Sequence, residues 1–142
     1  MPDMNKLFSL FFAAFVLLIS NSVQADFVTK YSDWRDLNAS EKSGYVMGVW
    51  DGLRLMDHVG KDKNREKMAE LIGIDSCGSE LKLNSRMIVD AVDTTYLRNT
   101  QRWANGATLI VYGTIRHMCL KYINHTHRNW GLELLKPWEN WK

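Results

Sequence analysis

The histidines are the residues of this sequence that could most directly bind a metal ion. His125 and His127 are separated by one residue in a polar segment, and His117 precedes them as a more distant third nitrogen ligand. Protein zinc sites combine histidine with cysteine or carboxylate ligands at short spacings. No nearby carboxylate completes such a set here, so we expect exposed histidines and predict neither a metal ion nor another cofactor.

Carboxylates support general acid-base catalysis most clearly when two of them act as a pair. Asp51 stands alone in an apolar segment, and we expect a hydrogen-bonded or solvent-edge residue there. Asp90 and Asp93 are one helical turn apart and could share a face, but two acids on a helix usually belong to a solvated surface, and we expect one here. The sequence has no Gly-x-Ser-x-Gly motif and no phosphate-binding glycine loop. By elimination, the sequence predicts a binding protein. An enzyme is the alternative, and it would require an unrecognised catalytic role of Asp51 or of the tail histidines.

The two cysteines, Cys77 and Cys119, both lie in the part of the chain that we expect to be exported. In an oxidising compartment they predict one disulfide, which closes a loop of about forty residues and contributes roughly 4 kcal/mol in the loop-entropy model. Two free thiols and a zinc site are the alternatives. Paired Cys-x-x-Cys spacing, which is typical of zinc sites, is absent, and this favours the disulfide.

Residues 1–25 have the pattern of a cleaved signal peptide. Lys6 precedes an apolar run over 7–20, and Val23-Gln24-Ala25 matches the small-residue cleavage pattern. An uncleaved membrane anchor is the alternative, but the run is shorter than the ~20 residues that span hydrocarbon. We therefore expect an exported mature chain of residues 26–142, located in the periplasm and not associated with a membrane after cleavage.

The charges of the chain are nearly balanced and are mixed along its length. The chain of 142 residues has 18 lysines and arginines against 16 aspartates and glutamates, a net charge of +2. Nucleic-acid binding requires a basic patch or stripe, so this distribution argues against such a partner. Residues 26–142 have the size of one ordinary domain with a small hydrophobic core.

Helical periodicity dominates the mature chain. Asn38 with Glu41 forms a capping box before a predicted helix over 39–59, and Asn84 caps a predicted helix over 85–98. We also predict helices over 63–72 and 105–123, an irregular segment before residue 38, and a loop over 74–83. A short strand at 109–111 is the alternative for part of the last helix. The sequence thus predicts an all-α bundle of four to five helices, with the disulfide joining the loop at Cys77 to the last long helix.

Three glycines at every fourth position distinguish the first long helix. Gly44, Gly48 and Gly52 lie on one side of it, and each costs about 1 kcal/mol relative to alanine. We expect another helix or an aromatic ring to pack closely against them and offset that cost. The alternative is a binding groove over bare backbone. The predicted core-facing stripe beside the glycines consists of Tyr45, Val49, Leu53 and Met56.

The C-terminal segment is unusually rich in tryptophan. Of six tryptophans in the chain, Trp130, Trp138 and Trp141 fall in this short segment, which Pro137 interrupts. Large aromatic side chains dominate both cores and protein interfaces. We expect the segment to pack back over the domain, and the alternative is a dimer or partner surface.

The order of these features resembles the Rap/Tai family, small periplasmic immunity proteins that protect bacteria from peptidoglycan amidases delivered by type VI secretion. The resemblance covers roughly residues 40 to 122, through the segments GYVMGVWDGL, IDSCGSE, NSRMIVDAVDTTYLRN and ATLIVYGTIRHMCL. Cys77 and Cys119 match the cysteine pair of the family, while Tyr45, Gly48 and Asp51 match its first-helix pattern. The resemblance implies a disulfide-bonded helical fold that blocks the active-site cleft of a toxin, in some members as a homodimer.

Contacts with such a protein partner are expected in exposed segments between helices. These are the charged turn 61–65, the loop 79–82 and the pair at 102–103. The candidate contact residues are Lys61, Lys63, Arg65, Glu80, Lys82, Arg102 and Trp103, and the candidate structural residues are Tyr45, Gly48, Asp51 and Gly52. A periplasmic acid-stress chaperone of the HdeA type, also small, helical and linked by one disulfide, is the alternative function.

Overall fold

The computed structural model of the chain describes residues 28–59 and 65–137. Within these residues the chain forms six α-helices, one short 3-10 helix and no strand, so the all-α prediction is confirmed. In chain order the elements are α2 (Tyr31–Asp36), α3 (Ala39–Val59), α4 (Arg65–Glu80), α5 (Ser85–Arg98), η1 (Thr100–Arg102), α6 (Ala107–Met118) and α7 (Leu120–Asn129). The predicted signal peptide over 1–25 lies outside the described residues.

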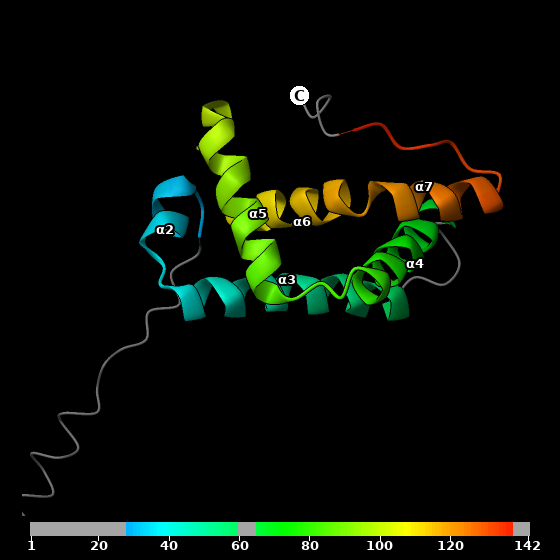
Figure 1. Cartoon of the computed structure of the whole chain (residues 1–142), viewed down its shortest axis with the longest axis horizontal. Coiled ribbons are helices and arrows are strands. Elements are labelled where there is room, and N and C mark those ends of the chain that lie inside the picture. Colours follow the sequence, from blue (N-terminus) through cyan, green and yellow to red (C-terminus); the bar gives the residue numbers. More distant parts are fainter. Residues whose placement is uncertain (1–27, 60–64, 138–142) are drawn as a thin grey trace, which may run out of the picture.

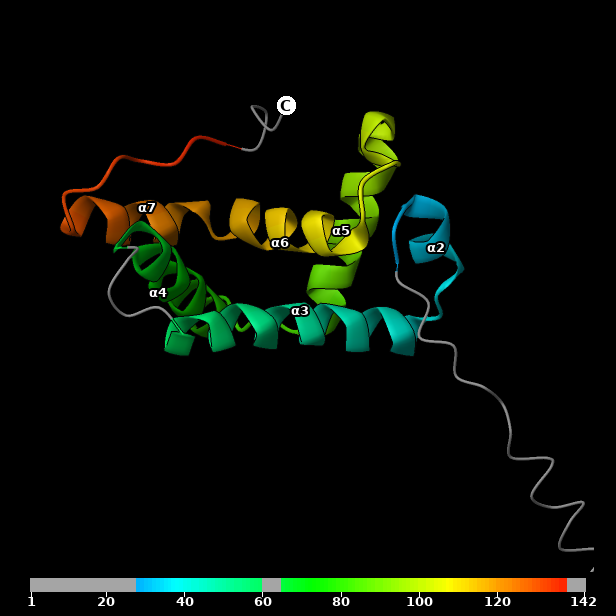
Figure 2. The same cartoon turned by 180° about the vertical axis from the view of Figure 1, so that it is seen from behind.

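α3, α6 and α7 lie on two opposite sides of the molecule, and α4 and α5 cross between these sides (Figure 1). α3 runs along one side of the molecule, and α6 and α7 follow one another along the opposite side (Figure 1). α5 packs on both α3 and α6, whereas α4 packs mainly on α7. The view from behind shows α2 at the end where α3 begins (Figure 2). Among the described helices, none is long and apolar enough to cross a membrane.

The core is one cluster of buried side chains to which all six helices contribute. The stripe predicted for α5 faces it, because Ile88, Val92 and Tyr96 are all buried. Both predicted helix starts are also present. Asn38 Oδ1 accepts hydrogen bonds from the backbone N–H groups of Ser40 and Glu41, and Glu41 Oε2 accepts one from Asn38 N at 2.8 Å. This reciprocal capping box satisfies backbone donors that the first helical turn leaves without partners.

α4 is longer than the sequence predicts. The expected helix over 63–72 and loop over 74–83 are replaced by one helix that continues through Cys77 and Gly78 to Glu80. The glycines in this segment are used for close packing. A Cβ on Gly73 would lie 2.4 Å from Ile123 Cα in α7, and a Cβ on Gly78 would lie 3.0 Å from the Trp50 ring. Tertiary packing therefore outweighs the low helix propensity of glycine here.

The predicted disulfide joins Cys77 to Cys119, with a Cα–Cα distance of 5.4 Å. Both cysteines are fully buried. Cys77 lies in α4, and not in a loop as the sequence suggested. Cys119 lies at the junction of α6 and α7, where its φ of −95° and ψ of 3° interrupt the single helix predicted over 105–123. The disulfide thus holds α4 against the point where the α6–α7 helix is broken.

The segment before α3 is helical and not irregular as predicted. Trp34 of α2 is fully buried, and its Nε1 donates a hydrogen bond to Asp93 Oδ1 at 2.7 Å. Lys42 Nζ lies 3.0 Å from the same carboxylate and 5.3 Å from the centre of the Trp34 ring. Asp93 therefore connects α2, α3 and α5, which corrects the expectation that it belongs to a solvated helix surface.

The described part of the C-terminal segment packs back over α7, as predicted. Asn124 Nδ2 donates to Leu135 O at 2.9 Å, and Leu135 N donates to Asn124 Oδ1 at 2.8 Å. In Figure 1 the segment runs from the end of α7 back towards α6. Trp138 and Trp141 lie outside the described residues.

Candidate partner-binding surface

The glycines of α3 face solvent, and the prediction that they pack against a neighbouring element is wrong. Among residues 28–59 and 65–137, a Cβ built on Gly44, Gly48 or Gly52 would meet no atom within 4 Å. The geometry of the helix explains this result. Gly44 and the buried Leu53 are nine residues apart, which at 3.6 residues per turn places them on opposite sides of α3. The glycines thus leave backbone accessible at the surface instead of admitting a second helix.

Two large apolar side chains lie on the same solvent-facing side of α3 as these glycines. Met47 is 44% exposed and Leu55 is 64% exposed. We define the α3 face as five exposed residues of this helix: Gly44, Met47, Gly48, Asp51 and Leu55. The face is low at Gly44 and Gly48, which have no side chain, and its two apolar members, Met47 and Leu55, lie on either side of Asp51 along the helix. Such a surface is shaped to receive a protruding side chain or helix.

A cleft of about 210 Å³ lies beside the α3 face, between α3, α4 and α5. Trp50 forms part of its wall and rests on Gly78, whose missing side chain makes room for the ring. The ion pair between Arg54 Nε and Asp75 Oδ1, at 3.1 Å, is another part of the lining. Met47 lines the cleft as well, so the cleft and the α3 face are continuous. The other lining residues are Ser79, Leu83, Asn84, Ser85 and Ile88.

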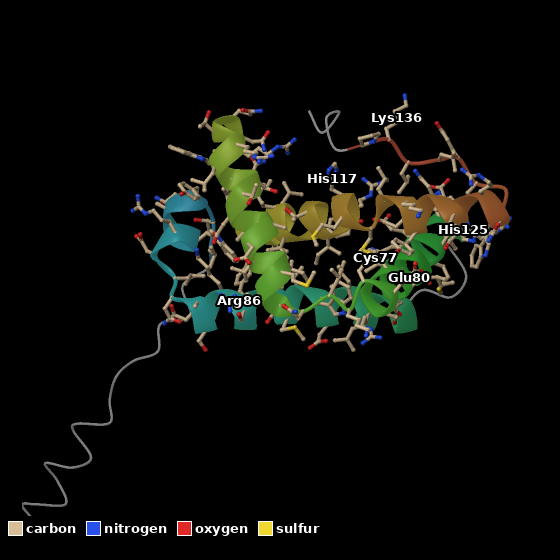
Figure 3. All side chains as sticks on the ribbon, viewed as in Figure 1. Cys77, Glu80, Arg86, His117, His125 and Lys136 are labelled. Atoms are coloured by element: carbon tan, nitrogen blue, oxygen red, sulfur yellow. A yellow bond between two sulfur atoms is a disulfide. The ribbon has the colours of Figure 1, made fainter. Side chains whose placement is uncertain are left out.

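The contact residues predicted from the sequence do not form one surface. Arg65 and Glu80 are the first and last residues of α4, about 22 Å apart at 1.5 Å per residue. Arg65 Nη2 donates to Trp130 O at 3.1 Å, and Lys82 is exposed in the turn that follows α4. Figure 3 shows Glu80 at the end of α4, on the side of the molecule nearer α3. Lys61 and Lys63 lie outside the described residues.

Arg102 and Trp103 lie beyond α5, away from the predicted contacts on α4. Trp103 is 44% exposed, but its ring stacks on Tyr31 with centroids 4.9 Å apart. Its Nε1 also donates to Tyr96 O at 3.0 Å. Much of this side chain therefore holds the N-terminal segment against the end of α5. Arg102 lines a separate cleft between α5 and α6.

The three histidines considered for metal binding point in different directions. His127 is buried, and its Nδ1 is 2.7 Å from Glu133 O, whereas His125 is exposed and its Nε2 is 3.1 Å from Asn129 Nδ2. Residues two apart on a helix lie on different sides of it, which explains the divergence. His117 is exposed on α6. The described residues contain no group of three or more His, Cys, Asp or Glu that could hold a metal ion.

The other residues singled out from the first helix have distinct environments. Tyr45 is half-buried; its hydroxyl is 2.6 Å from Thr108 Oγ1 and its ring meets Trp34 edge-on. Asp51 is exposed. Sequence reasoning missed Met47, Trp50 and Leu55 as surface residues. A signal was available, since Met47 and Leu55 fall outside the apolar stripe of α3 and lie near the glycines.

Comparison with known proteins gives no further guidance, since no family model, curated protein or solved structure matches this chain. What the structure itself defines is a disulfide-linked α-helical protein with an open, glycine-lined helix face next to a tryptophan-walled cleft.

Proposed function

We propose that this protein is a periplasmic immunity protein that binds a peptidoglycan amidase toxin of a type VI secretion system and occludes its active site. The surface that makes the contact is the α3 face together with the adjoining cleft. The observation that carries this proposal is the space that the described part of the chain leaves open over Gly44 and Gly48, beside exposed Met47 and Leu55.

The energetic argument concerns the cost of the glycines. Each interior helical glycine lowers helix stability by about 1 kcal/mol relative to alanine. On α3 no neighbouring atom within the described chain comes close enough to offset that loss. A partner that approaches the bare backbone closely would offset it on binding. Exposed Met47 and Leu55 favour an apolar contact, and methionine adapts readily to the shape of a partner.

The part of the protein beneath the α3 face and the adjoining cleft is already ordered before binding, which supports tight binding. Trp50 is held against Gly78, and the disulfide fixes α4 in the core. α4 is also joined to α6, because Tyr112 Oη donates to Glu70 Oε1 at 2.7 Å and Arg116 Nε lies 3.0 Å from the same oxygen. Burial, and with it the hydrogen bond to Glu70, raises the pKa of Tyr112, so the hydroxyl remains a donor even in alkaline solution. Side chains that are ordered before binding lose less entropy in the complex.

The amidase as partner comes from the resemblance to the Rap/Tai immunity proteins. The residues that carry the resemblance in the first helix, Tyr45, Gly48 and Asp51, include two members of the α3 face. Export to the periplasm is compatible with the disulfide between Cys77 and Cys119, because disulfides persist in oxidising compartments.

The test is co-expression of the exported chain with the amidases encoded beside its gene, with bacterial growth as the readout. One amidase should be lethal alone and tolerated with this protein. The variant Gly48→Leu should fold, because position 48 is exposed and a Cβ there meets no described atom within 4 Å, and it should lose protection. Lys121→Leu, which places the same side chain on an exposed position of α7, is the matched control and should protect.

The possible outcomes test the immunity function and the assignment of the α3 face as its contact surface separately. Protection from none of these amidases, together with no stable complex, would overturn the immunity function. Full protection by Gly48→Leu would retain the function but exclude the α3 face as its contact surface.

A further inference from the structure

The cleft of about 210 Å³ beside the α3 face is lined on one side by a row of three α3 side chains: Met47, Trp50 and Arg54. We call these residues the α3 row. Their separations of three and four residues place them on one side of a helix, with neighbouring Cβ atoms about 5–6 Å apart. The three side chains therefore present one continuous surface to a group that enters the cleft.

The walls of this cleft are held in place by contacts within the protein. The benzene part of the Trp50 ring lies against Gly78, where a Cβ would be only 3.0 Å from Trp50 Cζ2. Leu83, which also lines the cleft, donates its backbone N–H to Gly78 O at 3.0 Å. Ile88, another lining residue, belongs to the buried core. Because the cleft is formed before binding, a ligand need not order it.

The lining of the cleft has no net formal charge. Among the described residues, its charged members are Arg54 and Asp75, and Arg54 Nε lies 3.1 Å from Asp75 Oδ1. The remaining polar members, Ser79, Asn84 and Ser85, are uncharged. A charged ligand group would lose part of its hydration in the cleft and would meet no unpaired opposite charge. The cleft therefore favours an uncharged side chain.

The residue types of the α3 row favour an aromatic ring over an aliphatic group. A second ring packs on tryptophan with offset or edge-to-face geometry, and the sulfur of methionine makes favourable contacts with rings. A guanidinium is attracted to the face of a ring. Arg54 can make this contact while it is paired with Asp75, because its hydrogen bonds lie in the plane of the guanidinium and leave the two faces open.

The size of the cleft agrees with this chemistry. A closed apolar cavity of about 150 Å³ is large enough to bind benzene. The cleft of about 210 Å³ therefore has room for the ring of a phenylalanine or tyrosine.

We infer that this cleft binds an aromatic side chain, phenylalanine or tyrosine, which projects from the protein partner and anchors it beside the α3 face. The inference deepens the proposed function, and it rests on that function for the identity of the partner as an amidase. Aromatic side chains that fill a pocket at the centre of an interface commonly carry much of the binding energy.

Binding of the ring can be measured without the amidase. The experiment is an NMR titration of the folded, disulfide-bonded protein with N-acetyl-phenylalaninamide. The comparison probe is N-acetyl-cyclohexylalaninamide, which has a saturated six-membered ring. The aromatic probe should cause saturable shift changes at residues that line the cleft, at millimolar concentrations. It should bind about threefold more tightly than the saturated probe, because only the aromatic ring interacts specifically with the α3 row.

Two exposed methionines provide a matched pair of variants. Met47 lines the cleft and is 44% exposed, whereas Met87 of α5 does not line it and is 41% exposed. Met47→Ala should weaken binding of the aromatic probe about threefold, because the contact between sulfur and ring is lost. Met87→Ala should leave binding unchanged. Both side chains are largely in solvent, so both variants should fold.

Several results would overturn the inference. Equal or tighter binding of the saturated probe would show that the cleft takes an aliphatic side chain. Shift changes at the cleft when the protein alone is diluted would show that a second copy of the chain occupies it. Shift changes confined to other surfaces, equal effects of the two methionine variants, or no binding of the aromatic probe would each contradict the inference as well.

The same titration separates this inference from the proposed function. An amidase that the protein neutralises should displace the aromatic probe from the cleft. A probe that stays bound in that complex would overturn the inference and leave the immunity function intact. Specific binding of the aromatic probe, without protection from any amidase, would support the chemistry assigned to the cleft and overturn the immunity function.

Discussion

Gly73 in α4 and Gly48 in α3 are both interior helical glycines, but their surroundings are opposite. At Gly73 the backbone of α7 is so close that an added Cβ would lie 2.4 Å from Ile123 Cα, whereas a Cβ added at Gly48 would have no atom of the described residues within 4 Å. The first glycine permits a helix crossing inside the protein. The second leaves backbone exposed to solvent. The two glycines lower helix stability by about the same amount, but they are present for different physical reasons. Only their three-dimensional surroundings distinguish an internal contact from a surface available to a partner.

The stability of the protein should depend more on the α4–α7 crossing than on the α3 face, and most of all on the disulfide. Replacing Cys77 and Cys119 together by alanine should lower the free energy of unfolding by roughly 4 kcal/mol, because the loop of 42 residues is then unconstrained in the unfolded chain. Urea unfolding of the variant and of the wild-type protein measures the difference. Reduced wild-type protein should unfold near the midpoint of the variant. An unchanged midpoint after reduction would contradict this role of the disulfide.

Adding a single methyl group at the crossing of α4 and α7 should have the next largest effect on the free energy of unfolding. Gly73→Ala should destabilise the protein by about 2 kcal/mol, because overpacking against backbone exceeds the gain in helix propensity. The neighbouring atoms are Ile123 Cα and N, which cannot move away as a flexible side chain would. Urea unfolding is again the measurement. A variant as stable as the wild type would show that the crossing is looser than the structure indicates.

The same methyl group on the α3 face should act in the opposite direction. Gly48→Ala should raise the free energy of unfolding by up to about 1 kcal/mol, since it improves helix propensity and meets open space. The two alanine variants thus form a matched pair. If Gly48→Ala destabilises the isolated protein, the face is covered by something within the chain or by a second copy.

The sequence predicts those parts of the fold that depend on local interactions. The start of α3 is set by Asn38 and Glu41, and the bounds of α5 agree with the prediction at both ends. Residues that depend on distant partners were not predictable in this way. Gly78 suggested a loop, but the Trp50 ring packs on it and α4 continues. Asp93 resembled a solvated acid, but it binds Trp34 and Lys42.

The candidate surface was harder to predict than the fold. The seven predicted contact residues were chosen for exposure, and exposure alone does not show which segments are adjacent. For the glycines of α3, the sequence allowed both an internal contact and an open groove. The decision required the position of Gly44 relative to buried Leu53 and the distances to neighbouring atoms.

The most direct test of the α3 face is the affinity of the cognate amidase for Gly48→Leu and for wild-type protein, measured by calorimetry alongside the melting temperature of each. The leucine should leave the fold intact and weaken the complex by about a hundredfold, as expected for an obstruction at the centre of an interface. An amidase that binds the leucine variant and the wild-type protein equally well would contradict the assignment of this surface.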